Sequence, residues 1–131
     1  MGSFLDVWTD GRSWHEGEPT REPWLRVSVH DSDVGAIEYA PRFGGSGVAY
    51  AGYTARTYFE DESIPATDKS VEVEALRAWF SAAGVMGSDL REGLESLLVG
   101  EGEEADEPFV EEALAAFFEG TSLGFPDGVD G

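Results

Sequence analysis

Residues 24–30 are Trp24-Leu25-Arg26-Val27-Ser28-Val29-His30, a run in which apolar and polar side chains alternate. The apolar side chains stand at positions 25, 27 and 29, which is the period of a strand with one buried face. Asp31-Ser32-Asp33 supplies turn residues, and residues 34–39 are predicted to return as the second strand of an antiparallel hairpin. A glycine-rich loop over 40–47 and a third strand over 48–53 continue this meander.

The N-terminal segment adds less to the predicted sheet. Residues 4–9 are predicted as a short first strand, followed by turn residues at 9–12. Residues 13–23 are predicted to form an irregular loop, because Pro19 and Pro23 lack the N–H that a sheet ladder needs.

Helical periodicity dominates the second half of the chain. Residues 70–83 repeat apolar side chains every three or four positions, with Ser70 as N-cap, Asp68 nearby and Gly84 after the last turn. Further helices are predicted over 88–99 and 108–119, and the tail over 121–131 is expected to fray. The predicted fold is α+β: an antiparallel meander sheet followed by two or three helices packed on one face, in a single domain over 1–131.

The chain is strongly acidic. It has 131 residues, 27 of them Asp or Glu against 8 Lys or Arg, for a net charge of −19. Residues 85–131 hold 13 acids and 1 base, so this part contributes −12. Direct binding to nucleic acid is therefore disfavoured, since phosphate affinity comes from Lys and Arg. The acids can serve either solubility or attraction to a basic partner.

The sequence lacks the residues that several classes of chemistry require. The absence of cysteine excludes disulfides and thiolate sites, and His15 and His30 have no neighbouring histidine with metal-ligand spacing. Asp31 and Asp33 begin like a calcium loop, but Arg42 occupies the position of its bidentate glutamate. We therefore expect no cofactor, no metal and no catalytic residue. No apolar run is long enough to span a bilayer and no leader segment is evident, so a cytoplasmic location is expected.

An acidic aromatic loop is the strongest candidate for an interaction site. Tyr58-Phe59 is followed directly by Glu60-Asp61-Glu62. Aromatic side chains anchor protein interfaces, and carboxylates pair with Arg or Lys of a basic partner. We predict Tyr58, Glu60, Asp61 and Glu62 as partner contacts, with the C-terminal acids Glu101, Glu103, Glu104 and Asp106 as a second group.

The succession of segments between Trp24 and Gly84 resembles the Imm1-type immunity proteins of bacterial polymorphic toxin systems. The shared pattern is the strand at 25–29, the strand Val34-Gly35-Ala36-Ile37-Glu38-Tyr39-Ala40, the aromatic strand Gly47-Val48-Ala49-Tyr50, the acidic loop ending Ser63-Ile64-Pro65, and the helix from Val71 that ends before Gly84. The resemblance implies a non-enzymatic inhibitor that binds the catalytic domain of a cognate toxin, often a nuclease or deaminase, and covers its active site.

Other functions stay open from the sequence. A nucleic-acid mimic that occupies a DNA-binding protein would use the same acidity. A small carboxylate-dependent enzyme would need a deep pocket in the sheet's concave face, with a carboxylic acid of raised pKa. The sequence leaves the oligomeric state undetermined.

Overall fold

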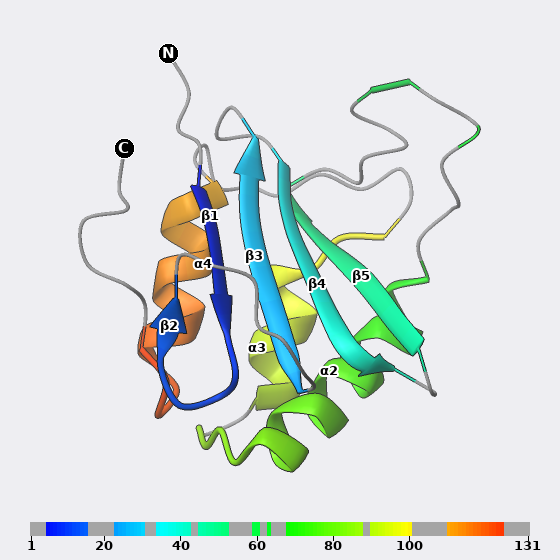
Figure 1. Ribbon diagram of the computed structural model, residues 1–131. Coiled ribbons are helices and arrows are strands. Elements are labelled where there is room, and N and C mark those ends of the chain that lie inside the picture. Colours follow the sequence, from blue (N-terminus) through cyan, green and yellow to red (C-terminus); the bar gives the residue numbers. More distant parts are fainter. Residues whose placement is uncertain are drawn as a thin grey trace.

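The fold was analysed in a computed structural model. It describes residues 5–15, 23–30, 34–42, 45–52, 59–60, 63, 68–87, 90–100 and 110–124. Five strands precede three helices in this part of the chain, which confirms the predicted α+β class (Figure 1).

The sheet is antiparallel throughout. Its strands are β1 (Leu5–Thr9), β2 (Trp14–His15), β3 (Trp24–His30), β4 (Val34–Arg42) and β5 (Gly45–Gly52), in the spatial order β2-β1-β3-β4-β5. The hairpin and the meander over β3, β4 and β5 are as predicted, and β1 pairs with β3 along its whole length.

Strand β2 lies where an irregular loop was predicted, so that prediction is wrong at its start. Trp14 and His15 pair with Thr9 and Trp8 of β1. The Thr9 hydroxyl donates to the Ser13 carbonyl at 2.7 Å and accepts the Gly11 N–H at 3.0 Å, which closes a tight turn between the strands. The prolines that suggested a loop come later in the sequence, after this turn is complete.

The glycine-rich loop is shorter than predicted. Strand β4 continues to Arg42 and β5 already begins at Gly45, so the loop prediction over 40–47 is wrong at both ends. The register shifts between Tyr39 and Arg42. Pro41 lies in this interval, and a proline, which cannot donate to the ladder, is tolerated in a strand at such an irregularity.

The helices are α2 (Lys69–Ala83), α3 (Leu90–Leu97) and α4 (Val110–Glu119). Asp68, and not Ser70, is the N-cap of α2, because its carboxylate accepts the Val71 N–H while Ser70 donates to it from the side. Gly84 ends α2 in the left-handed conformation with φ of 79°, as predicted. None of these helices is long and apolar enough to cross a membrane.

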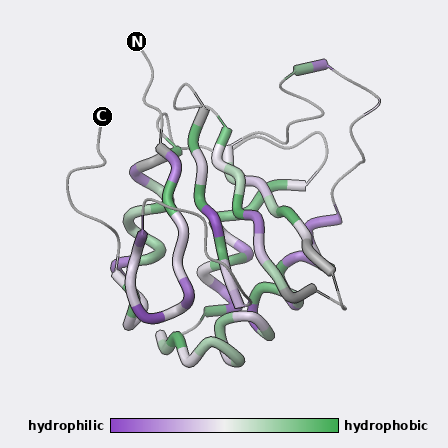
Figure 2. The backbone as a smooth tube through the Cα atoms, in the orientation of Figure 1, coloured by the Kyte–Doolittle hydropathy of each residue, from purple (hydrophilic) through white to green (hydrophobic). Residues whose placement is uncertain are grey.

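The core lies between the sheet and the helices. Trp79, Phe80 and Phe118 are almost fully buried there, and the Trp79 indole donates to the Ala40 carbonyl at 2.9 Å. Helix α4 packs closely on the sheet at Gly35, where an added Cβ would lie 3.0 Å from Leu114 and from Val110. Hydrophilic and hydrophobic segments follow one another along the strands, as a sheet with one buried face requires (Figure 2).

The chain remains attached to the core for several residues after α4. Thr121 forms an isolated bridge with Gly87, and the Ser122 N–H donates to the Met86 carbonyl. The Trp14 indole donates to the Gly124 carbonyl at 3.0 Å. These contacts tie the start of the expected tail to β2 and to the segment after α2.

Candidate functional site

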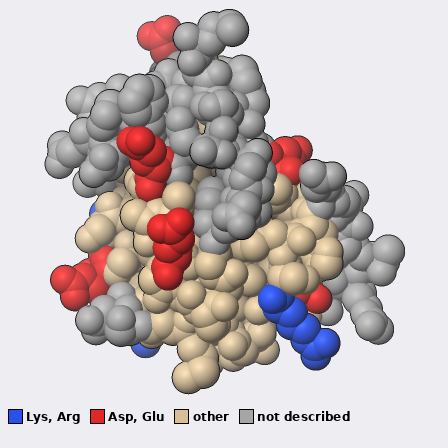
Figure 3. Space-filling view, turned by 90° about the vertical axis from the view of Figure 1, so that its left-hand side faces the viewer, with Lys and Arg blue, Asp and Glu red and all other residues tan. Residues whose placement is uncertain are grey.

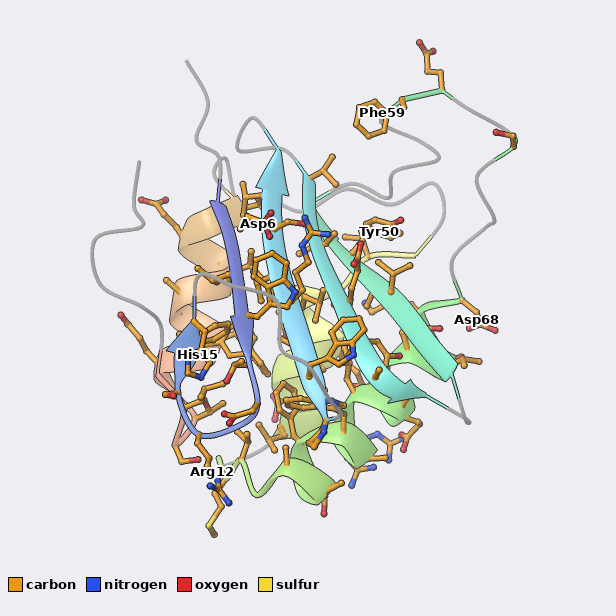
Figure 4. The ribbon with its side chains drawn as sticks, in the orientation of Figure 1. Asp6, Arg12, His15, Tyr50, Phe59 and Asp68 are labelled. Atoms are coloured by element: carbon orange, nitrogen blue, oxygen red, sulfur yellow. The ribbon has the colours of Figure 1, made fainter. Side chains whose placement is uncertain are left out.

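Glu60 is the one residue of the eight predicted contacts that the structure describes. It is exposed and has a φ of 52°, the left-handed region that non-glycine residues rarely adopt. Its neighbour Phe59 is 51% exposed, and Figure 4 places Phe59 beyond the upper end of the sheet, away from Asp6 and Tyr50. The other predicted contacts, Tyr58, Asp61, Glu62, Glu101, Glu103, Glu104 and Asp106, lie outside the described residues.

A second aromatic and acidic surface lies on the sheet itself, on the side opposite the helices. Strand register fixes its members, since residues paired across strands share a face. One row runs Trp8, Arg26, Glu38 and Val48, and the next runs Asp6, Ser28, Ala36 and Tyr50. With Trp24, which has the same parity as Arg26, these nine residues are called the outward face.

The aromatic side chains of the outward face are positioned for contact with another molecule. Trp8, Trp24 and Tyr50 are each partly exposed, whereas the core face of the same strands buries its side chains almost completely. Figure 4 shows Asp6 and Tyr50 on the viewer's side of the sheet, with the helices behind. Large aromatic rings that keep part of their area exposed are typical anchors of protein interfaces.

Arg26 holds the charged groups of this face together. Its Nε and Nη2 atoms donate to the two carboxylate oxygens of Asp6, each at 2.7 Å, and its Nη1 atom lies 3.5 Å from Glu38. The guanidinium also lies over the Trp8 ring, 5.0 Å from its centroid. The hydrogen bonds that Arg26 donates to Asp6, together with the charges of Asp6 and Glu38, raise the pKa of Arg26.

The charge of this cluster does not cancel. Asp6 and Glu38 carry two negative charges against the single positive charge of Arg26, so the outward face keeps a net charge of −1. Both carboxylate side chains remain 40% or more exposed. Because a carboxylate has more acceptor positions than one guanidinium fills, Asp6 and Glu38 can accept further hydrogen bonds from an approaching cation.

Sequence reasoning missed the outward face although its signal was present. The alternation in 24–30 placed Arg26 and Ser28 on the polar face, and the same parity includes Trp24. Trp8 joins this face only through its pairing with Arg26, which links residues far apart in the chain. A prediction of the β1–β3 register would have been needed to find it.

The helix side of the molecule carries separate acidic side chains. Glu92, Glu95, Glu112 and Glu119 are exposed on α3 and α4. Figure 3 views the left-hand side of Figure 1, where β2 and α4 lie, and it shows acidic side chains standing apart among uncharged ones, with fewer basic ones. This surface is negative without the aromatic residues of the outward face.

A hollow of about 490 Å³ lies between α2 and α3. It is lined by Arg77, Ser81, Val85, Met86, Gly87, Leu90 and Arg91. None of these described lining residues is a carboxylate, and the hollow lies on the helices, so it does not match the acidic pocket in the sheet that the enzyme alternative requires. Two carboxyls have a lowered pKa. The main cause is a hydrogen bond from the Arg12 N–H for Asp10 and one from the Ser70 hydroxyl for Asp68. A catalytic acid would need the opposite shift, a raised pKa.

Within the described ranges, no group of three or more His, Asp or Glu side chains has the arrangement of a metal site. Comparison of this chain with protein-family models, with curated proteins and with solved structures gave no match. The charge of the chain and the geometry of the outward face are therefore the observations that bear on its function.

Proposed function

We propose that this protein is a non-enzymatic inhibitor that binds a basic protein domain and covers its active site, as expected of an immunity protein acting on a cognate nuclease or deaminase toxin. The observation that carries the proposal is the outward face, where Trp8, Trp24 and Tyr50 surround the cluster of Asp6, Arg26 and Glu38 in a chain of net charge −19.

The two features of the face serve different steps of binding. A net negative charge speeds the encounter with a basic domain, because long-range attraction raises the association rate. Aromatic rings that become fully buried in the complex slow its dissociation. A toxin that acts on nucleic acid has a basic cleft, so the negative charge of this chain would attract it.

Rigidity of the face adds to the argument. The outward side chains stand on paired strands, and Arg26 fixes Asp6 and Trp8 in one arrangement. Side chains that are already ordered lose less conformational entropy when a partner binds. The acidic loop at Tyr58 to Glu62 is proposed as an additional contact, with Phe59 and Glu60 exposed at its described part.

The proposal is tested with the protein encoded by the neighbouring gene, which is the candidate toxin if this chain is an immunity protein. Both proteins are co-expressed, isolated as a complex, and their affinity is measured by titration calorimetry. Replacing Trp24 or Tyr50 by Ala is expected to cost about 1–2 kcal/mol of binding free energy, or a roughly 5- to 30-fold rise in Kd. The matched control is Met86→Ala, which removes a side chain that is 73% exposed beside the hollow between α2 and α3.

Two outcomes would contradict this function. One is unchanged affinity in both aromatic variants together with loss of affinity in the Met86 control. The other is turnover of a small compound by the purified chain that disappears when one carboxylate is replaced.

A further inference from the structure

Strand β5 forms one edge of the sheet and is unusually suited to accept another strand. Its sequence from Gly45 to Gly52 contains no charged residue and no proline. Exposed edge strands usually carry charges or proline, which prevent pairing with other chains. In a protein with 27 acidic residues, an edge of eight uncharged residues stands out.

The direction of the backbone groups along this edge follows from one hydrogen bond. The Val99 N–H donates to the Tyr50 carbonyl at 2.9 Å, from the side opposite β4. Backbone groups of a strand alternate in direction, so those of Val48 point the same way as those of Tyr50. Val48 therefore presents both its N–H and its carbonyl away from β4.

Within the part of the chain that the structure describes, the pairing along this edge is confined to its end. Leu98 and Val99 pair with the end of β5 at Ala51 and Tyr50 (Figure 1). Among the described residues, none bonds to the outward N–H or carbonyl of Val48. A buried backbone group without a partner would be costly, so this part of the edge either faces water or receives a partner.

Charge decides between the possible occupants. Pairing with a second copy would bring together two chains that each carry a net charge of −19, which like-charge repulsion opposes. A segment with Lys or Arg would be attracted instead, because Glu38 of β4 lies directly opposite Val48 of β5 in the register. With strands about 4.8 Å apart, Glu38 is roughly 10 Å from an added strand, within reach of a long cationic side chain.

We infer that the β5 edge accepts an extended, basic segment of the partner protein, which pairs with Val48 and adds one strand to the sheet. The basic character of this segment rests on the proposed function, whereas the lack of a described partner at Val48 does not. The added strand would lie next to Tyr50, so the edge and the outward face form one continuous binding surface.

Amide hydrogen exchange, followed by NMR on the full ¹⁵N-labelled chain, tests the inference. In the free protein, the Val48 amide is expected to exchange much faster than the Ala49 amide, which faces β4. The probe is a synthetic peptide of alternating Lys and Val, about as long as β5. Adding it is expected to slow Val48 exchange at least 10-fold.

Two control peptides separate strand pairing from charge attraction. A Lys–Val peptide methylated on every backbone nitrogen keeps its charge but cannot pair through either edge, and a Glu–Val peptide can pair but is repelled. Both are expected to leave Val48 exchange unchanged. These controls leave the protein intact, whereas the companion variant Val48→Pro removes the outward N–H. In this variant the probe is expected to cause no chemical-shift change at the neighbouring Gly47 and Ala49 amides, which shift in the wild-type chain.

Three results would overturn the inference: slow Val48 exchange in the free protein, no slowing by the Lys–Val peptide, or equal slowing by the methylated peptide. The inference and the proposed function fail separately. If the neighbouring gene product binds through Trp24 without protecting Val48, the edge inference is wrong and the function stands. If the peptide protects Val48 but that gene product does not bind, the proposed function fails and the accepting edge stands.

Discussion

The contact between Arg26 and Asp6 gives the most direct test of the order proposed for the outward face. Its strength is measured by a double-mutant cycle that combines Arg26→Ala with Asp6→Ala. The pair forms two parallel N–H to carboxylate hydrogen bonds at 2.7 Å, the geometry in which such pairs are strongest. The two side chains are 33% and 46% exposed, however, so solvent screens the interaction.

The expected coupling energy follows from these two facts. Exposed ion pairs contribute about 0.2–1 kcal/mol, and the bidentate geometry places this pair near the upper end, at about 1 kcal/mol. Arg26→Ala should cost more than Asp6→Ala, because it also removes the contacts with Glu38 and with the Trp8 ring. Those contacts add roughly 0.5–1 kcal/mol.

Urea unfolding of the wild-type chain, both single variants and the double variant supplies the free energies, with tryptophan fluorescence as the signal. The coupling should be about 1 kcal/mol at low ionic strength and should fall clearly at roughly 0.5 M salt, where charges on exposed groups are screened. A coupling below about 0.2 kcal/mol at low salt would refute the view that Arg26 fixes Asp6 in place.

Three further predictions concern stability. Gly11→Ala should lower the melting temperature far more than Gly84→Ala, although both glycines have positive φ. An added Cβ at Gly11 would lie 2.7 Å from the Cβ of Ala83 in α2, whereas the space at Gly84 is open. Equal losses in the two variants would contradict this reasoning. Tyr39→Phe removes the buried hydrogen bond to Glu72 and should cost about 1.5–3 kcal/mol in urea unfolding, and an unchanged midpoint would show that this bond contributes nothing. The Ser70 hydroxyl and the Val71 N–H hold the pKa of Asp68 below its ordinary value, so the stability it contributes is present above its unfolded-state pKa and is lost as the pH falls through the lower folded-state pKa. The stability difference between wild type and Asp68→Ala should therefore shrink in acid, and a difference independent of pH would contradict this cap.

The sequence predicted the fold class where local patterns were sufficient. The alternation around Leu25 predicted the bounds of β3, and the apolar spacing predicted those of α2 to within one residue. Strand β4 extends three residues beyond its predicted end. Each pattern is informative because it reflects burial of one face. Strand β2 was missed, since a two-residue strand has no period of its own and depends on the Thr9 hydrogen bonds. The N-cap was placed at Ser70 because capping residues crowd the start of α2, and geometry alone selects Asp68.

The candidate site was less accessible to sequence reasoning. The loop prediction relied on a local run of aromatic and acidic residues, of which Phe59 and Glu60 are described and exposed. The outward face depends on pairing between β1 and β3, which brings Trp8 beside Arg26. Such a surface is assembled from distant segments, so no single stretch of sequence announces it.

The association rate between this chain and the protein encoded by the neighbouring gene tests the central claim most directly. It is measured by stopped-flow fluorescence over a series of salt concentrations. Attraction between a chain of net charge −19 and a basic domain predicts that the rate constant falls at least ~10-fold between about 0.05 and 0.5 M salt, while the dissociation rate changes little. An association rate that is the same at every salt concentration would contradict the claim that the negative surface brings the partner to the outward face.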